Sequence, residues 1–292
     1  MKILQYAIKT PPEQVWQRIT KLLAARKRLA SFDNNHPCIF VLSTGRVGTE
    51  TLSALLNLSP NILSLHEPHP LLYQLARNAY QNEMTGCESV WDDAVMGLRS
   101  DLFDSALASG VGYVETSPQA TFLAPAFYRM VPDVKFIHLI RHPATVVRSG
   151  MRRGWYAGHS ADATRITPKD GSEDFNVWSG MTPLAKIAWL WSETNRWICE
   201  FTGKLPEEKY MLLKAGDIFS GDKNVLKKLY GFCSSEYPGE KRVNKILSKN
   251  YNKSRAGDFP PFEKWSSADV GQLKSHAGEM AKKMEYSLEP TS

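Results

Sequence analysis

Cysteine is scarce in this sequence and does not form a metal-binding or disulfide pattern. Among the 292 residues there are four cysteines, Cys38, Cys87, Cys199 and Cys233, without a Cys-x-x-Cys pair or a regular spacing. Such cysteines indicate free thiols in a reducing compartment. We therefore predict a cytoplasmic protein.

Long apolar runs and low-complexity segments are missing as well. No stretch approaches the ~18 consecutive apolar residues of a membrane span, and the opening residues MKILQYAIKTPPEQ hold too short an apolar run for a signal peptide. Hydrophobic residues make up 42% of the chain and charged residues 23%, which is typical of a globular protein. The sequence thus predicts a soluble protein without a membrane partner.

A third absence is the lysine of an ATP-binding loop. Residues 38–58, CIFVLSTGRVGTETLSALLNL, read as a buried strand, a tight glycine turn and a helix. Gly45 and Gly48 are too close together for the pattern G-x-x-x-x-G-K-[ST], and Glu50 would repel a triphosphate if it pointed inward. A nucleotide kinase or NTPase is therefore a disfavoured alternative.

The same turn nevertheless has the chemistry of an anion site. Its glycines allow backbone N–H groups to turn inward, and the helix that begins near Thr49 adds its positive end. Arg46 adds a planar charged group that suits oxyanions, and threonines add hydroxyl donors. The net charge of +6 agrees with an anionic ligand without identifying it. The predicted anion-binding residues are Gly45, Arg46, Val47, Gly48, Thr49, Glu50 and Thr51.

Strands alternate with helices along most of the chain. We predict strands at 38–44, 61–67, 112–118, 134–141 and 209–217, and helices at 12–30, 68–84, 142–153 and 183–201, with further helices toward the end. This order predicts an α/β fold with a central parallel sheet flanked by helices. We predict a single domain over residues 1–292, in which residues 1–35 form an N-terminal helical extension.

Four short motifs follow the predicted strands directly. They are residues 45–51, His66-Glu67, residues 115–117 and Arg141-His142. In an open parallel sheet, ligands bind where the carboxyl ends of the strands meet the following helices. We therefore expect the four motifs to converge at one edge of the sheet.

A second anion-binding candidate lies in FIHLIRHPATVVRSG, residues 136–150. An apolar strand ends in Arg141, and Ser149 follows eight residues later on the next helix. A phosphate at the strand end would contact Arg141 directly and Ser149 from the side of the helix. Taken alone, the pattern also fits an arginine at a sheet edge and an exposed serine.

Together, the glycine turn with Arg46 and the Arg-x-Pro motif with Ser149 resemble the PAPS-dependent sulfotransferase family, in particular its carbohydrate and bacterial small-molecule branch. PAPS is 3′-phosphoadenosine-5′-phosphosulfate. The resemblance implies the P-loop-containing sulfotransferase fold, with residues 45–51 around the 5′-phosphosulfate. It also implies that Arg141 and Ser149 hold the 3′-phosphate, which Arg255 reaches from a C-terminal loop. The product would be 3′-phosphoadenosine 5′-phosphate (PAP).

The sequence departs from the family pattern in the glycine turn and after the third strand. Residues 47–50, VGTE, stand where the family often has Ser-Gly-Thr-Thr, so one hydroxyl contact is lost unless Thr51 supplies it. Arg46 stands where lysine is common, and because arginine stays protonated it stabilises charge without donating a proton. Thr116 also replaces a frequent lysine, and we assign no chemistry to its turn.

The candidate general base lies at the end of the second strand. On an extended strand His66 and Glu67 point to opposite faces, so that one of them faces the crevice. The His-Glu-Pro pattern resembles the glutamate-using branch of the family, which favours Glu67 as the base over His66. The alternative role for Glu67 is to cap a helix that starts at Pro68. His66, Glu67 and His69 match no common metal motif, so no metal site is predicted.

The sequence does not identify the acceptor or the oligomeric state. Residues 154–180 form a long polar segment whose Trp155, Tyr156 and Trp178 either stack on a flat ligand such as a sugar or pack under a lid. We expect transfer to a hydroxyl or amine of a small-molecule or carbohydrate acceptor, with no nucleic acid as partner.

A non-catalytic polyanion-binding module is a further alternative. Arg148, Arg152 and Arg153, followed by Trp155 and Tyr156, would form its basic and aromatic face. A solvated helix end explains the same residues, and we prefer that interpretation.

Overall fold

The computed structural model describes residues 27–82, 86, 88–249 and 257–290, which include a five-stranded sheet. The strands are β1 (Cys38–Leu42), β2 (Ile62–Leu65), β3 (Gly112–Glu115), β4 (Lys135–Ile140) and β5 (Tyr210–Lys214). Their order is β2-β3-β1-β4-β5, and every neighbouring pair is parallel. The predicted α/β fold with a parallel sheet is confirmed.

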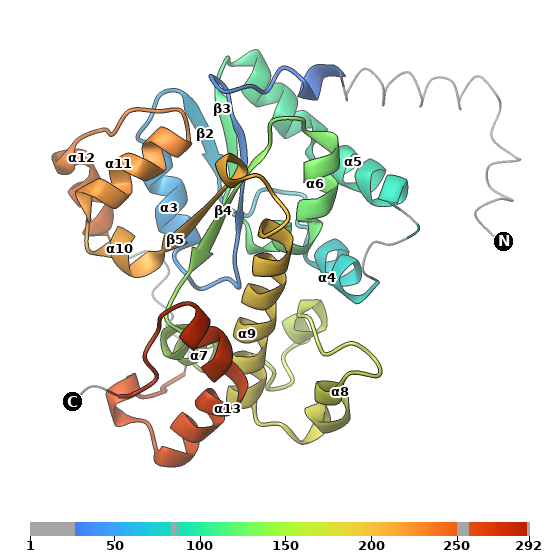
Figure 1. The fold of residues 1–292 in the computed structure, drawn as a ribbon, viewed down its shortest axis with the longest axis vertical. Helices are drawn as coiled ribbons and strands as arrows, with labels where there is room; N and C mark the ends of the chain where they lie inside the picture. Colours follow the sequence, from blue (N-terminus) through green and yellow to red (C-terminus); the bar gives the residue numbers. More distant parts are fainter. Residues whose placement is uncertain (1–26, 83–85, 87, 250–256, 291–292) are drawn as a thin grey trace, which may run out of the picture.

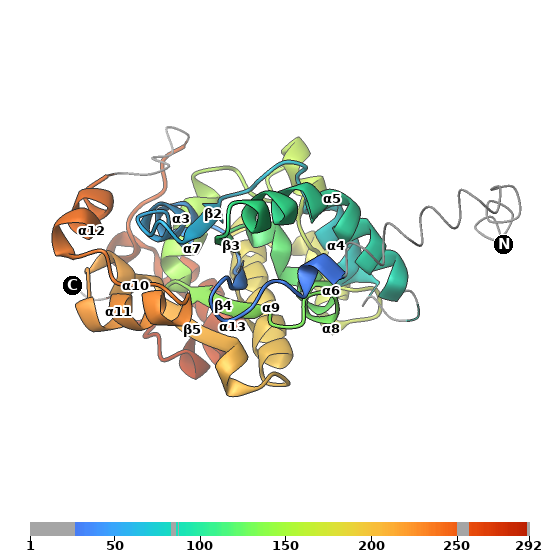
Figure 2. The same ribbon diagram turned by 90° about the horizontal axis from the view of Figure 1, so that it is seen from above.

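Helices cover both faces of the sheet (Figures 1 and 2). On one side lie α3 (Thr49–Leu56), α11 (Lys223–Phe232) and α12 (Glu240–Leu247), and on the other lie α5 (Glu88–Ala108) and α6 (Ala124–Met130). Because both faces are covered, every residue of β1 and β3 is buried, and β1 reads as a continuous apolar run.

The carboxyl ends of the strands open toward a second group of helices. There α7 (Pro143–Met151) and α13 (Ser267–Lys283) pack against α9 (Pro183–Thr202), which runs from them along β4 (Figure 1). The shorter helices α4 (Tyr73–Gln81), α8 (Glu173–Val177) and α10 (Ala215–Phe219) complete the surroundings of this edge.

The core between the sheet and α5 and α6 combines aromatic rings with one ion pair. Phe40 of β1 stacks on Phe127 of α6 with ring centroids 3.6 Å apart, and Phe103 of α5 contacts Phe40 edge-on. Nearby, Arg99 of α5 and Glu115 of β3 form an ion pair in which both side chains are fully buried.

Some predicted boundaries are wrong, and each error has a local cause. β2 ends at Leu65 rather than at residue 67, because Glu67 adopts a φ of 46°, which lies outside the strand region. The helix expected from residue 68 begins at Tyr73, and β5 ends at Lys214, where α10 takes over. α5 was not predicted at all, because the charged Arg99 interrupts its buried stripe.

The long segment 154–180 is not one loop. It contains the 3-10 helices η2 (Ser160–Thr164) and η3 (Trp178–Gly180) together with α8. The helix predicted at 12–30 lies mainly outside the described residues. None of the described helices is both long enough and apolar enough to cross a membrane.

Candidate active site

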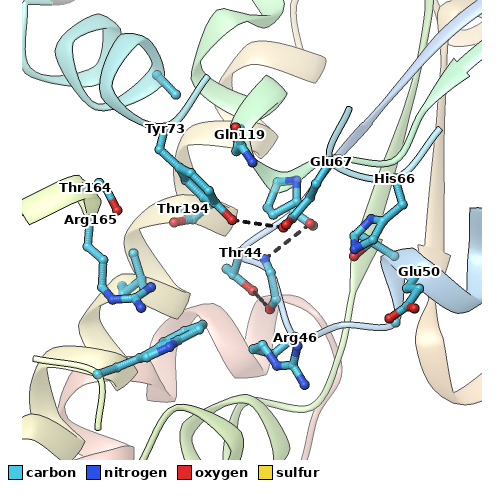
Figure 3. Close-up of a pocket in the computed structure, with 18 of the residues that line it drawn as sticks. Thr44, Arg46, Glu50, His66, Glu67, Tyr73, Gln119, Thr164, Arg165 and Thr194 are labelled. Atoms are coloured by element: carbon cyan, nitrogen blue, oxygen red, sulfur yellow. Dashed lines mark hydrogen bonds between the residues drawn. The ribbon is translucent and has the colours of Figure 1, made fainter. Parts of the chain in front are cut away.

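A cavity of about 660 Å³ lies at the carboxyl edge of the sheet (Figure 3). Its walls come from the glycine loop, which we define as residues 45–51, from residues that follow β2 and β4, and from η1 (Pro118–Leu123), α4, α9 and the 154–180 segment. The charged lining residues are Arg46, Arg77, Arg141, Arg153, Arg165 and Lys249 against Glu50 and Glu67. This excess of positive charge suits an anionic ligand.

The glycine loop owes its shape to three residues with positive φ. Gly45, Arg46 and Gly48 have φ of 79°, 59° and 102°, which curl the chain between β1 and α3. Gly48 must be glycine, because a Cβ atom there would lie 2.5 Å from Cζ of Phe219. Arg46 adopts the left-handed conformation without being glycine, as residues at functional sites sometimes do.

Hydrogen bonds to η1 fix the chain just before the glycine loop, and the loop leads into the N-terminus of a helix. The Ser43 N–H donates a hydrogen bond to Oγ1 of Thr121 at 2.9 Å, and the Thr121 hydroxyl donates to the Ser43 carbonyl at 3.0 Å. α3 begins at Thr49, as predicted, so its first N–H groups and its positive end lie at the cavity. The backbone is therefore set up to hold an anion.

Three arginines converge on this loop. Arg46 Nε donates a hydrogen bond to Ser149 Oγ at 3.0 Å, and Arg141 Nη1 lies 3.5 Å from the Arg46 carbonyl oxygen. Burial lowers the pKa of Arg46, the charges of Arg153 and Arg141 lower it further, and Glu67 and Glu50 act in the opposite direction. Like charges held together out of water are stabilised when an anion binds between them.

Arg141 is fixed by the elements around it. Its guanidinium carbon lies 5.0 Å from the ring centre of Phe219, and its carbonyl oxygen accepts a hydrogen bond from Trp191 Nε1 at 2.9 Å. Burial lowers the pKa of Arg141. Phe219 is exposed and also lines the cavity, so it offers a flat apolar surface beside the charged group.

The structure brings most of the predicted anion-binding residues to the cavity. Gly45, Arg46, Gly48, Thr49, Glu50, Thr51 and Arg141 line it. The side chain of Val47 is buried in the core instead, and Ser149 contributes through its hydrogen bond with Arg46. Arg255 lies outside the described residues.

Of the four motifs expected at this edge, residues 115–117 do not line the cavity, and the Arg141-His142 motif lines it only through Arg141. Glu115 points into the core, where it pairs with Arg99 and accepts a hydrogen bond from the Tyr113 hydroxyl at 2.8 Å. His142 caps α7, with Nδ1 accepting from the Ala144 N–H, and its Nε2 donates to the Ser287 carbonyl at 2.7 Å. Both side chains therefore have structural roles.

The prediction that His66 and Glu67 point to opposite faces is wrong. The strand ends before them and Glu67 has left-handed backbone geometry, so both side chains line the cavity (Figure 3). Glu67 does not cap the following helix, whose N-cap is Leu72. Instead its Oε1 accepts a hydrogen bond from the Tyr73 hydroxyl at 3.0 Å. Burial and the nearby Glu67 raise the pKa of Tyr73 to about 12, so Tyr73 remains a donor.

His66 is held by the turn after β3. Its Nδ1 lies 2.9 Å from the Thr116 carbonyl oxygen, which accepts hydrogen bonds only, so Nδ1 is the donor. In the neutral ring Nε2 then carries a lone pair. His66 and Glu67 are thus both placed to accept a proton.

The aromatic residues of the 154–180 segment divide into two groups. Trp155 lines the cavity, and its ring lies 4.0 Å from the guanidinium carbon of Arg165. Tyr156 and Trp178 pack against each other at 5.3 Å between ring centroids, and the Tyr156 hydroxyl donates to the Ile166 carbonyl. The last two therefore support the wall of the cavity.

The basic face expected for a polyanion-binding module is not continuous. Arg148 Nε donates to the carbonyl oxygens of Phe259 and Pro260, and Arg152 Nε donates to that of Gly257. Arg153, by contrast, lines the cavity. These arginines thus serve different parts of the structure.

Several lining residues were not predicted as site residues. They are Tyr73, Arg77, Gln119, Arg153, Arg165, Thr194, Phe219 and Lys249. No local motif marks them, because each reaches the cavity only through the packing of its element. Within the described residues no cluster of three or more His, Cys, Asp or Glu side chains is placed to hold a metal ion.

Comparison with known proteins identifies the family. Residues 37–238 match the model of the "Sulfotransferase family". Since this range spans more than half of the chain, the protein belongs to the sulfotransferase family. A search of curated proteins finds no significant match.

Solved structures share the fold at low sequence identity. The sulfotransferase domain from the curacin biosynthetic pathway is 16% identical with a TM-score of 0.52, covering 87% of this chain and 99% of that one. The sulfotransferase domain of the Synechococcus PCC 7002 olefin synthase is 16% identical with a TM-score of 0.53, covering 88% and 97%. Sulfotransferase STF9 from Mycobacterium avium is 13% identical with a TM-score of 0.52, covering 94% and 83%.

Proposed function

We propose that the protein transfers the sulfuryl group of PAPS to a hydroxyl or amine of a small-molecule or carbohydrate acceptor in the cytoplasm. The convergence of Arg46, Arg141 and Arg153 at the glycine loop, with Ser149 hydrogen-bonded to Arg46, is the observation that carries the proposal. It creates a half-buried site for more than one anionic group next to two candidate bases.

The residues present fit the two anionic ends of PAPS, which supplies the sulfuryl group. The glycine loop and the first N–H groups of α3 are the proposed partners of the 5′-phosphosulfate, and Arg141 and Ser149 those of the 3′-phosphate. Arg153 is a further partner, because its Nε is buried without a hydrogen-bond partner among the described residues. Arg255 remains a predicted ligand of the 3′-phosphate.

Charge stabilisation and proton removal are the tasks of the protein side chains. Arg46 and the loop amides stabilise the negative charge that develops on the leaving phosphate. Glu67 takes the proton of the acceptor group and is oriented by Tyr73. His66 is the alternative base. Positioning of the two reactants contributes most of the remaining rate enhancement, as in phosphoryl transfer.

The two alternative functions receive less support. Glu50 belongs to the glycine loop and lines the cavity, where a carboxylate disfavours the triphosphate of a kinase or NTPase. A polyanion-binding module needs an exposed basic face, whereas Arg148 and Arg152 hold the segment at residues 257–260.

Thermal unfolding with nucleotides tests the proposal. PAP, the desulfated cofactor, is compared with AMP and with ATP–magnesium at concentrations far above their dissociation constants. A ligand present at ~100 times its Kd adds roughly 2.7 kcal/mol to the free energy of unfolding. For a chain of this size the midpoint then rises by at least about 5 °C.

Each outcome has a defined meaning. A shift with PAP that AMP does not match supports the site for the 3′-phosphate. A shift with ATP–magnesium alone would contradict the roles of Arg141 and Ser149 and indicate a kinase. If no nucleotide shifts the unfolding midpoint and the protein binds a polyanion with an affinity that falls steeply with salt, the protein is a polyanion-binding module.

A further inference from the structure

The cavity has a second basic region, away from the glycine loop. Arg77 of α4 lines the cavity, and its Nε is buried without a hydrogen-bond partner among the described residues. No ion pair between Arg77 and a described carboxylate is present either. A half-buried guanidinium without a counter-charge is costly, which points to a ligand that supplies one.

Arg165 lines the same cavity as Arg77. η2, which ends directly before Arg165, packs against α4. Burial raises the pKa of the Tyr156 hydroxyl, and the positive charges of Arg165 and Arg77 both lower it, so both guanidinium groups lie within electrostatic reach of this hydroxyl. Figure 3 shows Arg165 on the side of the cavity opposite His66 and Glu50. The Trp155 ring, 4.0 Å away, and Asp162, whose Oδ1 accepts from Arg165 Nε at 3.2 Å, hold its guanidinium in place.

Asp162 neutralises this region only in part. Its carboxylate also accepts hydrogen bonds from the backbone N–H groups of Tyr156, Gly158 and His159. Its primary task is therefore to shape the turn before η2. The terminal nitrogens of Arg165 have no hydrogen-bond partner among the described residues and stay available to a ligand.

The rest of this region suits a compact organic molecule. Phe122, Ile166 and Leu190 provide apolar wall, and Thr194 contributes a buried hydroxyl that has no partner in the described structure. In Figure 3 the side chains of Tyr73 and Thr194 lie between Arg165 and Glu67, so a molecule that extends from Arg165 along them places a reactive group near the candidate base. The region thus has the position of an acceptor site.

We propose that the acceptor carries an anionic group, a carboxylate or a phosphate, in addition to the group that is sulfated, and that Arg77 and Arg165 bind this anion. The inference rests on the proposed function in one respect, namely that the molecule bound here is the acceptor of the sulfuryl group. The anion site itself stands on the two arginines. Paired guanidinium groups bind planar oxyanions through several charge-assisted hydrogen bonds, and a neutral analogue leaves them unpaired.

Binding of matched small probes tests the proposal. With PAP saturating the glycine loop, benzoate and phenyl phosphate are titrated against the protein by calorimetry, and benzamide and benzyl alcohol serve as neutral controls. We expect an anionic probe to bind at least about 10-fold more tightly than its neutral control, which corresponds to one charge-assisted hydrogen bond. Whichever anion binds more tightly identifies the carboxylate or the phosphate.

Variants locate the site. The double variant Arg77→Gln/Arg165→Gln should lose the preference for the anion while it retains the thermal shift with PAP, which shows that it is folded. Arg28→Gln removes one exposed charge that does not line the cavity and should change nothing. Equal binding of neutral and anionic probes, or a preference that survives in the double variant, would overturn the inference.

The proposed function and this inference fail in different ways. If PAP does not bind, the donor assignment fails. The probes are then titrated against Arg46→Ala without PAP, so that a preference dependent on Arg77 and Arg165 still reports the anion site. If PAP binds and the anionic probes show no preference, the inference alone is wrong.

Discussion

Arg46 and Ser149 are 103 residues apart in the sequence and are joined by a hydrogen bond of 3.0 Å from Nε to Oγ. Arg46 belongs to the glycine loop after β1, and Ser149 belongs to the helix after β4. β1 and β4 are neighbours in the sheet, which brings the two motifs together. Two predicted anion-binding elements thereby lie side by side.

Ser149→Ala should weaken the binding of PAP by about 10-fold, because one hydrogen bond to a charged group is removed. AMP, which lacks the 3′-phosphate, should be affected much less. The dissociation constants of both nucleotides measure this, with Thr145→Ala, one turn earlier on α7 and outside the cavity lining, as the control. Equal losses for PAP and AMP would mean that Ser149 only orients Arg46.

Glu67→Gln should lower turnover by at least ~10²-fold, the usual contribution of a general base. PAP affinity should stay close to that of the unchanged protein. His66→Gln is measured beside it, because His66 Nε2 is the competing proton acceptor. If His66→Gln abolishes turnover and Glu67→Gln retains it, the assignment of the base is reversed.

Tyr73→Phe should reduce turnover because Tyr73 orients Glu67, and Tyr73 has no separate role in the reaction. It removes the hydroxyl that donates to Glu67 Oε1, so we expect a loss of about 10-fold in turnover. In a protein that already carries Glu67→Gln, the same change should have little further effect. A double-mutant cycle on kcat decides this, and additive losses would exclude a shared role.

Glu115→Gln should destabilise the fold by about 3–5 kcal/mol, because it leaves the buried charge of Arg99 without its partner. Urea unfolding measures this, and Glu289→Gln, which breaks an exposed pair with Lys274, should cost less than about 1 kcal/mol. If Glu115→Gln costs no more stability than the control variant Glu289→Gln, water reaches Arg99 and the pair is not a buried one.

Buried His138 should make stability fall in weak acid. Burial lowers its pKa from 6.5 to about 4, and its Nε2 donates to Asn195 Oδ1 at 2.8 Å. Between these two pKa values, His138 is protonated in the unfolded chain and neutral in the folded chain. Stability is complete above pH 6.5 and is lost as the pH falls toward 4, by about 2.5 kcal/mol between pH 7.5 and 4.5.

His138→Gln isolates this contribution, since glutamine retains a donor for Asn195 but does not titrate in this range. Urea unfolding between pH 7.5 and 4.5 should show a shallower decline for the variant. Parallel curves for the two proteins would mean that His138 accepts its proton in the folded state.

Local sequence pattern determined the strands, the glycine loop and the start of α3. Apolar runs such as residues 38–42 bury themselves in any parallel sheet, and only glycine fits at Gly48 without strain. The spacing from Arg141 to Ser149 likewise predicted an arginine at a strand end and a serine on the next helix. These features depend on residues that are neighbours along the chain, so they can be predicted from the sequence.

Tertiary structure alone decided which polar residues face the cavity. Glu115 is the last residue of β3 and Arg141 directly follows β4, yet Glu115 turns into the core because Arg99 of α5 offers a buried partner. Arg153, which the sequence suggested only as part of a basic face, follows α7, and Arg165 follows η2; both reach the cavity only through the packing of these elements. A side chain's direction after a strand ends depends on contacts with residues distant in sequence, and those contacts exist only in the folded chain.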